Sequence, residues 1–196
     1  MIKRLKKFLI LSTIIFLSCS TSYHKYLAKD VNPNGKIAVI ICETQLSAEH
    51  ALFADILSNG FEADTKLNVV PQHKVKSVLV DYPMRIRGPF RILGLDFIKA
   101  EKRLDLDTLS VMAKKLNVNY VYAIWIVQAL EVNISPKVIR YTYVAELIEF
   151  PSRRVIADVS NTMYGEENRD TFRTSCGYQS GLIVKDIIDN TGIGKL

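Results

Sequence analysis

The 196-residue sequence is poor in the residues that most often carry metal or covalent chemistry. Three cysteines are too few for a small domain that is held together by disulfides. The three histidines, at positions 24, 50 and 73, have no metal-ligand spacing, so we expect no metal and no cofactor. The sequence also lacks a glycine-rich phosphate loop and a Gly-x-Ser-x-Gly motif. These absences argue against an enzyme.

The N-terminus has the organisation of a secretory signal peptide. Residues 1–7 carry four basic side chains and no acid, and residues 8–17 are apolar apart from Ser12 and Thr13. A helix of ten residues rises only about 15 Å, which is half the hydrocarbon thickness of a bilayer. This apolar run is therefore too short to span a membrane, and we expect residues 1–18 to be a cleaved signal peptide.

A single cysteine follows the apolar run, in the order Phe16-Leu17-Ser18-Cys19. This order resembles the bacterial lipobox, in which the cysteine becomes the first mature residue and is acylated, for example with palmitate. An acylated Cys19 would hold the protein on a membrane stably, since two lipid signals already suffice. We expect a lipidated cysteine with a flexible tether over residues 19–35, and one domain over residues 36–196.

The positive charge of the chain is concentrated in two segments. Residues 1–18 hold four basic residues and no acidic one, so their removal lowers the formal net charge from +6 to +2. Residues 74–103 carry a net charge of +5, whereas the rest of the mature chain carries −3. Because the export signal sends the chain out of the cytoplasm, we expect no nucleic-acid partner.

Within residues 74–103, two short alternating arms flank a Gly88-Pro89 turn. A cationic, half-apolar protrusion of this kind is suited to anionic lipid headgroups, an acidic partner or a second copy of the chain. The alternative is a solvated loop whose apolar residues cover the edge of the sheet. We predict that partner contacts are made by Arg85, Arg87, Phe90 and Arg91.

Hydrophobic periodicity predicts an α/β fold, with a mixed sheet of about five strands and helices packed on it. The strands are expected at residues 36–42, 66–70, 120–130, 138–150 and 155–163. Helices are expected at residues 48–59, ended by Gly60, at 108–116, capped by Asp107, and at 170–189. The first half alternates as parallel crossovers require, and the second half contains an antiparallel hairpin.

The order of these segments resembles a known superfamily. The likeness is carried by the strands Ile37-Ala38-Val39-Ile40 and Leu67-Asn68-Val69-Val70, the helix 109–116 that runs into 117–123, and the hairpin within 146–156. These segments are similar to the superfamily that contains the amino-terminal domain of TolB, the curli-secretion lipoprotein and outer-membrane lipoprotein activators of penicillin-binding proteins. The resemblance implies the fold and a periplasmic lipoprotein, and it implies no reaction.

Two further sets of residues leave alternatives open. Cys42 and Cys176 are a candidate disulfide, because an exported chain permits one, but each cysteine would also suit a buried packing position. Four tyrosines could form an exposed platform for a ligand or could pack across neighbouring strands: Tyr120, Tyr122, Tyr141 and Tyr143.

The sequence therefore predicts a membrane-anchored lipoprotein of the cell envelope, in the outer membrane and facing the periplasm. We expect it to act without catalysis, as an interaction or assembly module that binds another envelope protein or itself. The alternative is a periplasmic lipoprotein that binds a small ligand or a glycan.

The lipid anchor is directly testable through Cys19. We expect Cys19→Ala to abolish acylation and to release the protein from the membrane fraction, because the acyl chains supply the membrane affinity. Metabolic labelling with a fatty acid and membrane fractionation measure both effects. Acylation that is retained in the variant would contradict the assignment of Cys19.

Overall fold

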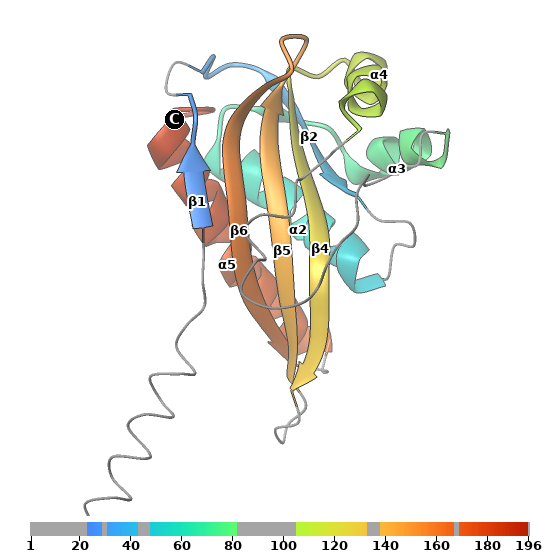
Figure 1. Cartoon of the computed structure of the whole chain (residues 1–196), viewed down its shortest axis with the longest axis vertical. Helices are drawn as coiled ribbons and strands as arrows, with labels where there is room; N and C mark the ends of the chain where they lie inside the picture. The colour runs from blue at the N-terminus through green and yellow to red at the C-terminus, as the bar shows by residue number, and fades with distance from the viewer. Residues whose placement is uncertain are drawn as a thin grey trace, which may run out of the picture.

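The structure is a computed structural model, and it describes residues 23–28, 31–42, 48–81, 105–132, 138–166 and 169–195. These residues form one six-stranded mixed sheet with helices on both faces (Figure 1). The strands are β1 (Tyr23–Tyr26), β2 (Lys36–Ile41), β3 (Asn68–Val69), β4 (Tyr120–Val132), β5 (Val138–Glu149) and β6 (Arg154–Glu166). The helices are α2 (Ala48–Asp64), α3 (Gln72–Asp81), α4 (Leu106–Leu116) and α5 (Arg169–Thr191).

The strand order in the sheet is β1-β6-β5-β4-β2-β3. Strand β2 pairs in parallel with β3 and β4, whereas β4, β5, β6 and β1 pair antiparallel. The predicted α/β class and mixed sheet are confirmed, including the change from parallel to antiparallel pairing. The sixth strand, β1, was not predicted.

The sheet is buried on both faces around β2 and β4. Along β2, Ile37, Val39 and Ile41 contact the layer formed by α2 and α5. The alternate residues Ala38 and Ile40 contact the layer formed by α3 and α4. This two-sided burial explains why β2 is a continuous apolar run, as expected for a central strand.

The core on the α2 and α5 side contains two aromatic pairs. Phe53 of α2 meets Tyr143 of β5 edge-to-face, with ring centroids 5.8 Å apart. Phe61 of α2 meets Tyr122 of β4 in the same way at 5.7 Å. Edge-to-face pairs of this kind contribute about 0.5–1.5 kcal/mol each beyond the burial of their apolar area.

Two predicted helix ends are wrong. Helix α2 continues through Gly60 to Asp64. An added Cβ at Gly60 would lie 3.4 Å from Val184 Cγ2 of α5, which is an ordinary van der Waals contact. Gly60 therefore lies where α2 packs against α5, inside the helix and not at its end. Helix α4 is capped by Asp105, whose side chain accepts a hydrogen bond from the Thr108 amide, and not by Asp107. Its other end is as predicted, at the left-handed Asn117.

The candidate disulfide is not formed. Cys42 and Cys176 are both buried thiols. Cys42 lies in the core cluster on the α3 and α4 side, whereas Cys176 lies in the cluster on the α2 and α5 side. The sheet separates the two sulfur atoms, so the packing interpretation holds. Burial also raises the pKa of the Cys176 thiol to about 12.

Gly194 provides a test of the packing beside the C-terminus. Its φ is +59°, and an added Cβ would lie 2.7 Å from Thr65 Cβ and 2.8 Å from Leu67 Cγ. We expect Gly194→Ala to lower the free energy of unfolding by about 2–4 kcal/mol, through backbone strain and overpacking. Chemical denaturation measures the change.

Gly181→Ala is the matched control, because an added Cβ at Gly181 in α5 would meet nothing within 4 Å. Alanine is the better helix former, so this variant should gain up to about 1 kcal/mol. Equal losses in the two variants would contradict the packing described at Gly194.

Candidate functional site

The first described residues join the sheet directly, and we call residues 23–28 the stem. Strand β1 pairs antiparallel with the edge of β6, with Tyr23 opposite Ser160 and Tyr26 opposite Ala157. The Leu27 amide then donates to the Ile156 carbonyl at 2.8 Å, and the side chain of Ala28 is buried in the core. The stem is thus part of the domain, although the sequence predicts a flexible tether there.

A hydrogen bond fixes the stem to helix α5. The Tyr26 hydroxyl donates to Oδ2 of Asp186, and the Asn190 side-chain amide donates to Oδ1 of the same carboxylate at 3.0 Å. Burial, followed by the hydrogen bond to Asp186, raises the pKa of Tyr26 above its ordinary value. These three side chains, which we call the stem lock, connect β1 to the helix that covers β6.

The chain after the stem is also held in place. The Tyr120 hydroxyl donates to the Asn32 carbonyl at 3.0 Å, and the Lys36 amide donates to Oδ1 of Asn119 at 2.9 Å. Gly35 lies against the Tyr120 ring so closely that an added Cβ would be 2.6 Å from Cε2. The predicted tether over residues 19–35 is therefore wrong for residues 23–28 and 31–35, which belong to the domain.

A row of charged residues crosses the sheet beside the stem. Glu146 on β5 lies directly opposite Asp158 on β6, and Asp158 lies opposite Lys25 on β1. Glu146 is only 9% exposed, on the face of the sheet that α3 and α4 partly cover. Two carboxylates at opposed positions repel each other, so a cation beside them is favourable. The stem supplies one such cation, Lys25.

The pattern of acids in the sequence did not reveal this row. Glu146 and Glu149 are on opposite faces of β5, as alternation requires, and Glu149 instead forms an ion pair with Arg154 at 3.1 Å. Asp158 and Lys25 come next to Glu146 only through the register of three antiparallel strands. Among the described residues, no three acidic, histidine or cysteine side chains gather as a metal site.

The tyrosine platform that we considered is not an exposed surface. Tyr120, Tyr122 and Tyr143 are at most 1% exposed. Burial raises the pKa of Tyr122 well above its ordinary value, as expected for a hydroxyl inside the core. The side chain of Tyr141 lies outside the described residues. The cross-strand packing interpretation is therefore correct for the three described tyrosines.

Several predicted site residues lie outside the described residues. They are the signal peptide, Cys19, and the contact residues Arg85, Arg87, Phe90 and Arg91. Their roles stay predictions. In the described part of the chain, no helix is long and apolar enough to cross a membrane.

The sequence matches no family model and no curated protein. The solved structures to which this chain is similar include bacterial lipoproteins.

Three particular structures illustrate this likeness. The PelC dodecamer from Paraburkholderia phytofirmans is 11% identical over 87% of this chain and 99% of its own, with a TM-score of 0.49. Lipoprotein GNA1162 from Neisseria meningitidis is 11% identical over 79% and 98%, with a TM-score of 0.48. The hypothetical protein CT253 from Chlamydia trachomatis is 14% identical over 80% and 94%, with a TM-score of 0.45. Likeness at this level says nothing about the activity of this chain.

The stem lock can be tested with Tyr26→Phe. We expect this variant to lose about 1–3 kcal/mol of stability at neutral pH, because it removes a hydrogen bond to a carboxylate. Amide hydrogen exchange should also quicken in residues 23–28. The control is Tyr178→Phe, because Tyr178 is 68% exposed and its hydroxyl can be lost with little effect.

The same two variants should also differ in how their stability depends on pH in the alkaline range. The raised pKa of Tyr26 means that the folded state retains a proton that the unfolded state loses above about pH 10. Its contribution to stability is full below that pH and declines as the pH rises toward the folded pKa. Tyr26→Phe should therefore flatten the alkaline loss of stability, whereas an unchanged pH profile would contradict the lock.

Proposed function

We propose that the protein is an outer-membrane lipoprotein that faces the periplasm and acts, without catalysis, as an interaction or assembly module. The observation that carries this proposal is the position of the stem. Strand β1 begins at Tyr23, four residues after the predicted lipidation site Cys19. An anchor at Cys19 would thus be coupled almost directly to the central sheet of the domain.

The stem lock supports the same role. A lipid anchor on a long flexible linker leaves its domain free to reorient, whereas a short linker restricts the orientations that the domain can adopt. Hydrogen bonds from β1 to β6 and from Tyr26 to Asp186 keep the attachment point fixed on the domain. A fixed orientation suits a protein that presents one surface to a partner in the envelope.

The resemblance of the sequence to the superfamily of TolB and the curli-secretion lipoprotein supports the periplasmic lipoprotein part of the proposal. In our proposal the contact surface is basic and is formed by Arg85, Arg87, Phe90 and Arg91. The partner is another envelope protein with an acidic surface or a second copy of the chain. A positive segment on a nearly neutral domain favours encounter with an acidic surface.

Crosslinking in the native envelope tests this proposal. The variant carries Arg85→Ser, Arg87→Ser and Arg91→Ser, and we expect it to lose most of the crosslinked partner that wild type captures. Mass spectrometry of the crosslinked products measures the loss.

The control removes the same charge elsewhere, with Lys66→Ser, Lys114→Ser and Lys185→Ser, three exposed residues of the described domain. It should retain the partner. Unchanged capture by the arginine variant, or equal loss in both variants, would contradict the assigned contact surface.

A further inference from the structure

Three strands run on past the point where the stem joins the sheet (Figure 1). Tyr23, the first residue of β1, lies opposite Ser160, and β6 continues for six more residues to Glu166. The paired parts of β4 and β5 accompany it. At about 3.3 Å per residue, these strands reach roughly 20 Å beyond Tyr23. We call this part the extension and define it as residues 128–132, 138–142 and 162–166.

The chain between Cys19 and the stem is shorter than the extension. Four residue steps separate Cys19 from Tyr23, and even a fully stretched chain covers at most about 14 Å in that distance. If the strands run perpendicular to the membrane and the chain is fully extended, the end of the extension therefore lies at the depth of the anchor or deeper. A tilted domain lays the edge of β6 along the membrane surface.

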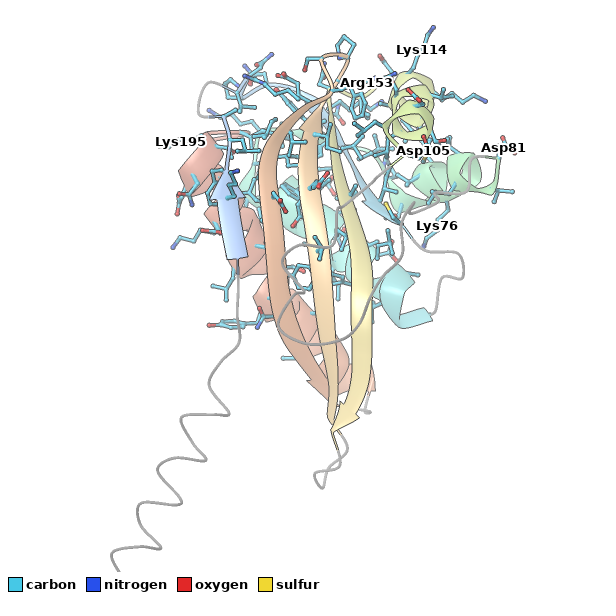
Figure 2. All side chains as sticks on the ribbon, viewed as in Figure 1. Lys76, Asp81, Asp105, Lys114, Arg153 and Lys195 are labelled. Carbon is cyan, nitrogen blue, oxygen red and sulfur yellow. The ribbon has the colours of Figure 1, made fainter. Side chains whose placement is uncertain are left out.

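The strand residues of the extension are poor in charge. Only three residues of the extension are charged: Glu131, Arg140 and Glu166. At the opposite end of the sheet, Figure 2 labels Arg153 and Lys114, and Arg153 forms an ion pair with Asp107 at 2.7 Å. Apolar and tyrosine residues with few charges suit the boundary between headgroups and acyl chains.

We infer that the extension is a lipid-contacting surface, which the short chain from Cys19 to Tyr23 holds on the headgroups of the membrane that carries the anchor. The inference rests on the proposed lipid anchor. It assigns the extension to the bilayer and leaves the opposite end, with α4 and the β5–β6 turn, facing the periplasm. The occupant of this surface is lipid and not a second protein chain.

Fluorescence quenching in vesicles tests the inference with the full, acylated protein. One variant carries Val138→Cys in the extension, and the control carries Val111→Cys on α4, where the side chain is 42% exposed. Each variant is labelled with an environment-sensitive dye and reconstituted in vesicles of phosphatidylethanolamine and phosphatidylglycerol that contain headgroup-nitroxide lipids. Wild type serves as the blank, because Cys42 and Cys176 are buried.

The dye at position 138 should be quenched by roughly half or more, as expected for a group within about 5–10 Å of the headgroups. The dye at position 111 should be quenched little. Equal quenching at both positions in vesicle-bound protein would overturn the inference. Crosslinking of two copies through position 138 without lipid quenching would assign the surface to a second chain, and would overturn it too.

A longer tether tests whether the short chain between Cys19 and Tyr23 is what holds the extension on the membrane. Eight glycine and serine residues inserted between Ser22 and Tyr23 let the anchor reach about 40 Å. Quenching at position 138 should then fall toward that at position 111, and unchanged quenching would overturn the role of the short chain. Failure of the lipid anchor itself is distinguishable, because the protein would then remain in solution and neither dye would be quenched.

Discussion

The structure depends on the two-sided burial of β4, the strand that joins the parallel and antiparallel parts of the sheet. It pairs in parallel with β2 and antiparallel with β5, and Tyr120 to Ile124 are all buried. The α2 and α5 layer can pack only because Tyr122 and Ile124 face it, while Val121 and Ala123 face α3 and α4. A polar residue at any of these positions would lack water on both faces of the sheet.

The same sheet determines how the protein can be attached. Because β6 lies outside β5, its free edge is available to β1, and the stem adds to the sheet there. The hydrogen bond between Tyr26 and Asp186 then ties the attachment point to α5. In our proposal, this arrangement turns a lipid on one cysteine into a constraint on the orientation of the whole domain. The lipid contact that we infer for the extension rests on that constraint.

Much of the fold could be predicted from local patterns, and the errors have physical causes. Continuous apolar runs identified β2 and β4, since both faces of a central strand are buried, and runs rich in strand-forming residues around a turn identified β5 and β6. These patterns missed β1, because Tyr-His-Lys-Tyr has no apolar period and forms a strand only through the edge of β6. Gly60 misled the prediction of α2, because glycine is a common helix terminator, whereas here it lies inside the helix beside Val184 of α5.

The sequence by itself determined the α/β class, and it predicts an export signal and an anchor at Cys19, since each of these depends on consecutive residues or on a short period. The tertiary structure decided what lies side by side. It placed Glu146 opposite Asp158 and Lys25, put Cys42 and Cys176 on opposite faces, and joined the stem to α5. Such neighbours depend on strand register and helix packing between segments far apart in the chain, which no local pattern encodes.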